Sequence, residues 1–121
     1  MHGYRVTEFG GVEVMKWVEM PDPVPGPGQL RVAVRASGIN FAETRMRAGT
    51  YSGQALPFVM GMESAGVVEA VGPGVSAFEP GDRVFGRARG SHATHVLFDV
   101  EHTLPLPDAL HHAGVLDAAE D

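Results

Sequence analysis

Polar side chains that could polarise a carbonyl group flank a short segment with helical character. Asn40 stands at its start, Arg45 lies within it and Tyr51 follows its end. An amide and a phenol can each donate a hydrogen bond to an oxygen that gains negative charge, and neither carries a net charge. Asn40 and Tyr51 therefore suit the stabilisation of an enolate. Each also has a structural alternative, since Asn is a favoured helix cap and an aromatic before Ser52 suits a loop.

Six histidines offer a second kind of chemistry. His92 and His95 are three residues apart, and His111 and His112 are adjacent. On a strand, residues three apart point to opposite faces, so His92 and His95 are not expected to converge on a metal. The default interpretation is that both are partly exposed strand residues. Imidazoles also move protons near neutral pH, which leaves a proton-transfer role open.

One glycine motif formally matches a dinucleotide fingerprint. Residues 72–77 read GPGVSA and follow an apolar strand. A nucleotide-binding turn must open directly into a helix whose N-terminal amides meet the pyrophosphate. Here Pro73 removes one amide, and Pro80 and Gly81 follow within a few residues. The segment is therefore predicted to be a turn.

The composition is that of one globular domain. The chain has 121 residues, 44% of them apolar, a formal net charge of -6 and no cysteine. Nucleic acids and anionic membranes are not expected as partners, because both need clustered Lys and Arg. No apolar run approaches the roughly 20 residues that cross a bilayer, and the N-terminus lacks the apolar core of a signal peptide, so we expect a cytoplasmic protein. Without cysteine there are no disulfides, thiolate nucleophiles or thiolate zinc ligands.

Short apolar runs between Gly and Pro turns predict a mainly β chain with one or two short helices. The clearest strand alternates, so that Leu30 and Val32 should face the core while Arg31 and Ala33 face water. Gly10-Gly11 predicts a two-residue hairpin turn. The predicted strands cover residues 4–9, 12–19, 29–36, 64–71, 83–85, 96–98 and the neighbourhood of 103–104.

One internal helix is predicted, with Asn40 as its N-cap, Glu43 as the partner in a capping box and Gly49 at its end. The residues after the last predicted strand could form a second short helix. We therefore expect one domain over residues 1–110 and a C-terminal tail over residues 111–121.

Residues 61–86 carry a longer pattern, which reads GMESAGVVEAVGPGVSAFEPGDRVFG. It resembles the G-x-E-x-x-G-x-V-x-x-V-G-x-x-V-x-x-F-x-x-G-D-R-V stretch in the GroES-like N-terminal domain of the medium-chain dehydrogenase/reductase superfamily. The resemblance continues upstream through PVPGPG at 23–28 and ASGINFAET at 36–44, and covers roughly residues 4–110. It implies a GroES-like, partly open β-barrel.

Within the superfamily, Asn40 and the absence of cysteine resemble the zinc-independent quinone oxidoreductase and enoyl reductase branch, whose members deliver hydride from NADPH to an enone or a quinone. This resemblance implies that Asn40 contacts cofactor and substrate, and that Tyr51 lines the substrate side. Arg45 stands where some quinone reductases have a tyrosine. Asn40 and Met62 replace the cysteine and histidine that hold catalytic zinc in related alcohol dehydrogenases, so no metal site is expected.

The Rossmann domain that follows in the superfamily has no counterpart in these 121 residues. We therefore expect the chain alone to bind no cofactor and to be inactive in hydride transfer, with NADPH used only when a Rossmann domain is paired with it. An alternative is a repurposed stand-alone protein, either a small-molecule binder, a non-redox cyclase or isomerase, or an assembly subunit. The substituted segment 91–95 motivates this alternative. We also expect a homo-oligomer, because a barrel without its partner domain exposes apolar residues and a strand edge.

Overall fold

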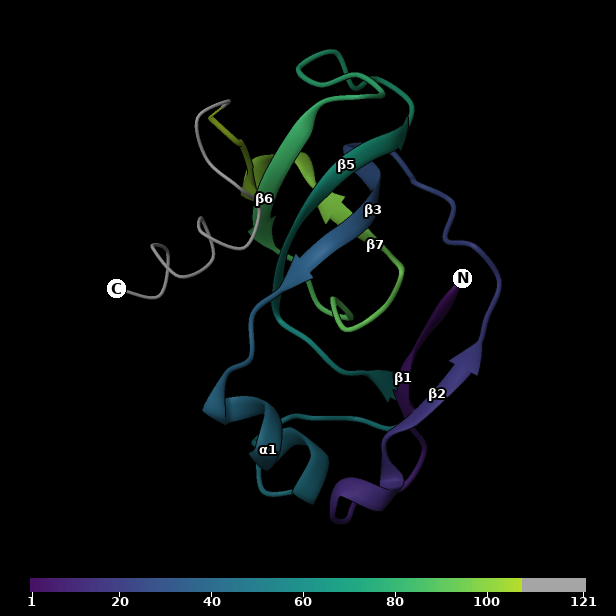
Figure 1. Ribbon diagram of the computed structural model, residues 1–121, viewed down its shortest axis with the longest axis vertical. Helices are drawn as coiled ribbons and strands as arrows, with labels where there is room; N and C mark the ends of the chain where they lie inside the picture. The colour runs from purple at the N-terminus through teal and green to yellow at the C-terminus, as the bar shows by residue number, and fades with distance from the viewer. Residues whose placement is uncertain (108–121) are drawn as a thin grey trace.

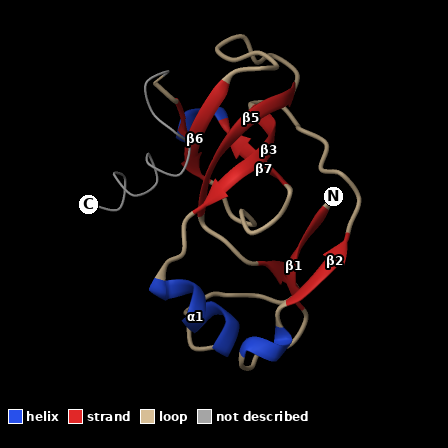
Figure 2. Ribbon diagram, viewed as in Figure 1, coloured by secondary structure: helices blue, strands red, loops and turns tan. Residues whose placement is uncertain are grey.

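Strands dominate the computed structural model, which describes residues 1–107 (Figure 2). Within these residues the single α-helix is α1 (Phe41–Ala48), and the 3-10 turns η1 (Val12–Val14) and η2 (Val100–His102) are shorter. The predicted mainly β fold is confirmed, while the predicted tail over 111–121 lies outside the described residues. The strands are β1 (His2–Val6), β2 (Lys16–Glu19), β3 (Gln29–Ser37), β4 (Phe58–Val59), β5 (Glu63–Val71), β6 (Arg83–Arg87), β7 (His95–Asp99) and β8 (Thr103–Pro105).

The strands form two antiparallel sheets. The five-stranded sheet has the order β7-β3-β5-β6-β8, and the three-stranded sheet has the order β2-β1-β4. Figure 1 shows the larger sheet curled in the upper part of the molecule, with β1 and β2 below it on one side and α1 below it on the other. This curled, incompletely closed sheet is the partly open barrel that the sequence predicted.

The core lies against β3 and β5, where Leu30, Val32, Val68 and Phe98 are almost completely buried. The predicted alternation along β3 holds for Leu30 and Val32. It is wrong for Ala33, which is only 8% exposed although it was predicted to face water. The register of β3 against β5 shifts at two places, between Arg31 and Val32 and again near Ala36, and such shifts break a strict two-residue period.

The predicted pairing of the first two strands is confirmed, but their predicted turn is wrong. β1 and β2 pair antiparallel, with Arg5 opposite Lys16. The connection is longer than Gly10-Gly11 and contains η1, whose Val14 is buried beside Val6 in a second, smaller core. Burial of Val14 replaces the tight turn by an inward-folded loop.

Helix α1 begins and ends at the predicted residues. Gly49 adopts φ 86° and its N–H donates to the carbonyl oxygens of Arg45 and Met46, as in a left-handed C-terminal cap. The predicted capping box is wrong. The side chain of Asn40 makes no capping hydrogen bond, and the carboxylate of Glu43 is buried against His92 instead of reaching back to Asn40. Within residues 1–107, no helix is long and apolar enough to cross a bilayer.

Candidate functional site

Helix α1 carries Asn40 at its N-cap, and Tyr51 follows its C-terminal end. The eight residues of α1 span roughly 12 Å along the helix axis. Arg45 is exposed on the helix, with its guanidinium 5.4 Å from the centre of the Phe41 ring. The structure therefore arranges the three candidate residues along one short helix and does not gather them around one point.

Tyr51 lines an open recess of about 650 Å³ together with Met62, Arg87 and Arg89. A phenol and two guanidinium groups give this recess hydrogen-bond donors, and Met62 gives it an apolar wall. Neither Asn40 nor Arg45 is among the residues that line it. Arg87 and Arg89 were not proposed from the sequence as site residues, because only the fold brings the β6 end close to the segment after α1.

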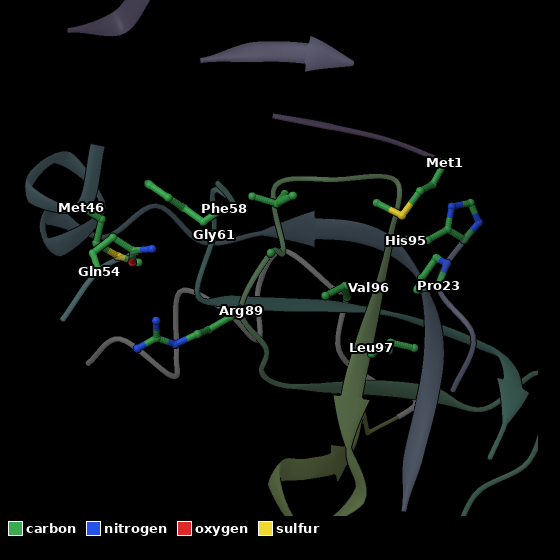
Figure 3. Close-up of a pocket in the computed structure, with 12 residues that line it drawn as sticks. Met1, Pro23, Met46, Gln54, Phe58, Gly61, Arg89, His95, Val96 and Leu97 are labelled. Atoms are coloured by element: carbon green, nitrogen blue, oxygen red, sulfur yellow. The ribbon is translucent and has the colours of Figure 1, made fainter. Parts of the chain in front are cut away.

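A second recess of about 350 Å³ lies next to the first and shares Arg89 with it. Figure 3 shows Met46 and Gln54 together at one end of this recess and His95 at the other, with Arg89 between them. The side-chain oxygen of Gln54 is buried and has no hydrogen-bond partner among the described residues. The recess thus combines apolar walls with an amide side chain and a cation, a combination typical of small-molecule sites.

His92 lies in the loop that joins β6 to β7, and not on a strand as predicted. Its side chain is 15% exposed and hydrogen-bonded on both sides. Nδ1 lies 2.9 Å from Ser37 Oγ, at the end of β3, and Nε2 lies 2.9 Å from Glu43 Oε2, on α1. The three side chains form a continuous chain of hydrogen bonds that links three elements. No local sequence signal indicated this cluster, because its members are far apart in the chain.

His95 points elsewhere, toward Glu69 at 3.1 Å, so the two imidazoles have different partners. The adjacent pair His111 and His112 lies outside the described residues. Within residues 1–107, no three His, Cys, Asp or Glu side chains come together as a metal site would require. An amide at Asn40 and a thioether at Met62 do not fit tetrahedral zinc, which takes Cys, His and carboxylate ligands.

A protein-family model for the alcohol dehydrogenase GroES-like domain matches residues 26–108. The chain belongs to this GroES-like domain family. Among curated proteins, the quinone oxidoreductase of Rattus norvegicus is 45% identical to this GroES-like domain over 114 residues, which are 91% of the chain and 35% of the relative. The chain therefore spans about a third of the length of the curated relatives it matches.

Solved structures agree with this assignment. A mycobacterial quinone oxidoreductase superposes on the GroES-like domain with a TM-score of 0.90 at 41% identity, over 98% of this chain and 37% of the other. The quinone oxidoreductase of Escherichia coli, solved in complex with NADPH, superposes with a TM-score of 0.88 at 32% identity, over 93% of this chain and 35% of the other. The predicted resemblance to the medium-chain dehydrogenase/reductase superfamily is confirmed.

Proposed function

We propose that this chain is the substrate-side domain of an NADPH-dependent oxidoreductase that reduces quinones or related enones. The observation that carries the proposal is the 45% identity to a quinone oxidoreductase over 91% of the chain. The relatives are about three times as long, and a solved one binds NADPH. The cofactor would be held by residues beyond the part that this chain matches.

Two features of the chain support this division between a substrate side in the chain and a cofactor side elsewhere. After β5 the backbone turns at Gly72, with the N–H of Val75 donating to the Gly72 carbonyl, and then continues to β6 without a helix. A pyrophosphate site of the common kind needs a helix N-terminus at that place. At the start of α1, Ile39 is 80% exposed and Phe41 74% exposed. Adjacent exposed apolar side chains of this size suit a surface that another domain covers.

Asn40 and Tyr51 then have different tasks. NADPH supplies a hydride when it is bound, and reduction leaves negative charge on the substrate oxygen. The Asn40 amide makes no hydrogen bond to the helix it begins, so its N–H groups are available to stabilise that oxygen. Because Asn40 is not among the residues that line the recess of Tyr51, we assign Tyr51 to another part of the substrate. Tyr51 instead lines the recess for the rest of the substrate, while Arg45 is exposed on the helix and does not line that recess.

The test is a chimera in which this chain replaces the matching third of the rat quinone oxidoreductase. We expect NADPH-dependent quinone reduction, and a fall in kcat/KM of about 100-fold for Asn40→Ala, the usual effect of losing one oxyanion donor. Ser76→Ala, an exposed change in the turn after β5, is the matched control and should leave the rate within twofold. A folded chimera that binds NADPH but reduces no quinone would refute the proposal.

The chain alone should not bind NADPH with useful affinity, since the Gly72 turn leads into a strand and not into a helix. Calorimetric titration of the 121-residue chain with NADPH measures this directly. Micromolar binding at one site would show that the division between cofactor side and substrate side is wrong.

A further inference from the structure

The hydrogen-bonded trio of Ser37, His92 and Glu43 is not used by the proposed reaction. Its central residue is fixed by its backbone as well as by its side chain. The N–H of His92 donates to the carbonyl of Met60, and its own carbonyl accepts from the N–H of Tyr4. The loop around it is anchored by Ser91, whose buried hydroxyl lies 3.0 Å from that of Ser64. Because the imidazole is fixed to the sheets, its hydrogen bond with Glu43 can fix the position of helix α1.

We propose that Ser37, His92 and Glu43 form a proton-binding clamp that fixes helix α1 against the sheets, so that His92 is a positioning residue for Asn40. Glu43 is the only member on α1 and lies one helical turn after Asn40, near the helix start. The clamp itself does not depend on the proposed function. Its consequence for substrate binding does rest on that function.

A count of the donors and acceptors in the trio indicates that it binds one added proton. Ser37 Oγ has one hydrogen but two neighbours that could accept it, the Glu63 carbonyl at 3.2 Å and His92 Nδ1 at 2.9 Å. With an ionised Glu43, a neutral imidazole uses its single N–H for the carboxylate, and Ser37 can then donate to only one of its two neighbours. The Glu63 carbonyl keeps a second donor, the N–H of Gly38 at 3.2 Å, so the neutral trio loses one hydrogen bond and leaves no acceptor unpaired. One added proton lets Nδ1 donate to Ser37 Oγ, which frees the hydroxyl hydrogen for the Glu63 carbonyl. All three contacts are hydrogen bonds only in the proton-loaded clamp.

The burial of Glu43 also favours the form of the trio that holds the added proton. Glu43 is 3% exposed, and its second carboxylate oxygen is buried with no hydrogen-bond partner among the described residues. With a neutral imidazole, the trio of Ser37, His92 and Glu43 carries a negative charge, whereas a proton shared between His92 and Glu43 leaves the trio neutral. Burying an uncompensated charge is costly, so the folded protein favours the loaded form.

Other charged groups surround the clamp without replacing its members. On α1, Arg47 lies four residues after Glu43, but its Nε is buried with no hydrogen-bond partner in residues 1–107. The carboxylate of Glu63, on β5, lies against Gly38 and close to the Ser37 end. The remaining titratable or charged side chains on the segments that flank His92 are His2, Tyr4 and Arg5 on β1, Arg89 in the same loop and His95 on β7, which is turned to Glu69.

The variant Glu43→Gln can form the same three contacts without binding the added proton. The new amide can donate to His92 Nε2, the neutral ring can donate from Nδ1 to Ser37, and Ser37 keeps its bond to the Glu63 carbonyl. All three contacts then form without an added proton. In the unaltered chain the native state holds an extra proton, so its stability should fall as pH rises through the range in which the clamp gives it up. The variant should lack this part of the pH dependence.

The experiment measures the unfolding equilibrium constant of the chain and of Glu43→Gln at pH 6 and pH 8.5. One hydrogen bond is worth about 1 kcal/mol. Between pH 6 and pH 8.5, the unfolding equilibrium constant should therefore rise about fivefold more in the unaltered chain than in the variant. Glu69→Gln is the matched control, because it makes the same change in the more exposed Glu69–His95 pair, where Glu69 also accepts from Arg31 at 3.3 Å. Its pH dependence should stay within twofold of the unaltered chain.

Nitrogen NMR of the imidazoles provides a second, independent measurement. We expect both ring nitrogens of His92 to carry hydrogen at pH 6 in the unaltered chain, and Nδ1 alone in Glu43→Gln. A neutral His92 throughout this pH range, or equal pH dependence in the chain and in Glu43→Gln, overturns the clamp.

The chimera with the rat enzyme tests the functional consequence. There the KM for quinone should rise between pH 6 and pH 8.5 with little change in kcat, and Glu43→Gln should remove that rise. An inactive chimera combined with the expected stability and NMR results would refute the proposed function and leave the clamp standing. Quinone reduction that depends on Asn40, combined with unchanged pH behaviour of Glu43→Gln, would refute the clamp alone.

Discussion

Gly66, on β5, has no room for a side chain. It is paired with Val34 on β3, and a Cβ built on it would collide with the backbone carbonyl of Ala33 and lie 2.8 Å from a methyl group of Val32. An ordinary contact needs at least 3.4 Å. Because a carbonyl is backbone and not the end of a flexible side chain, Gly66→Ala must push β3 and β5 apart. Neighbouring strands lie only about 4.8 Å apart, so the ladder cannot absorb such a shift.

We expect Gly66→Ala to lower the free energy of unfolding by about 3 kcal/mol. Two weakened ladder hydrogen bonds at about 1 kcal/mol each, and about 1 kcal/mol for overpacking, give this figure. Tm should fall by roughly 10 °C for a chain of this size. Urea denaturation followed by the fluorescence of Trp17 measures the change.

Gly26→Ala is the control, because a Cβ there would meet only the end of the Gln29 side chain at 3.4 Å. It should change the free energy of unfolding by less than about 1 kcal/mol. If Gly66→Ala proves as mild as Gly26→Ala, then β3 and β5 are not held as closely as the structure has them.

Three further predictions concern charge, metal and assembly. The α-ammonium of Met1 donates to Asp22 at 2.6 Å and lowers the pKa of that carboxyl, so NMR titration should find Asp22 ionised to lower pH than an ordinary Asp, and acetylation of Met1 should remove most of the difference. The depressed pKa means that this contact stabilises the fold at neutral pH and that the contribution is lost as pH falls through the folded-state pKa. The protein should be metal-free by elemental analysis after dialysis, and one zinc lost on mutating His92 or His95 would contradict this. Light scattering should detect a homo-oligomer at micromolar concentration, weakened by truncation after Asp108, whereas a monomer unchanged by truncation would show that no such interface exists.

The structure narrows how that association could occur. β7 is an edge strand of the five-stranded sheet in the described part of the chain, so its backbone is open to pairing. Its side chains Val96 and Phe98 are buried in the core, while Leu97 between them is half-buried. An interface on this strand would therefore use backbone hydrogen bonds, with Leu97 as its apolar side-chain contact.

The sequence predicted the barrel because its strands are bounded by residues with strong local preferences. Gly72 ends β5, and Gly81 and Asp82 lead into β6, as the turn chemistry required. The hairpin turn was mispredicted at Gly10-Gly11 because a tertiary contact, the burial of Val14, decided the path of the chain. The local preferences of residues carry no information about such tertiary contacts.

The candidate site was predictable only in part for the same reason. Asn40 was recognisable from its place before a helix. Glu43 also looked like a capping residue, and a capping box is a complete local explanation for it. Its actual partner, His92, is 49 residues away along the chain. A local pattern that explains a residue fully gives no reason to look for a distant partner, and the trio was missed on that account.

Asn40 occupies a helix N-cap without using its side chain as a cap. The first turn of α1 is therefore less stable than the same fold would permit. Serine or aspartate at position 40 could close that turn, and a screen for thermal stability alone would favour them. Such a screen would remove the one uncommitted amide at the start of the helix. Under the role proposed for Asn40, the outcome would be a more heat-resistant and less active protein.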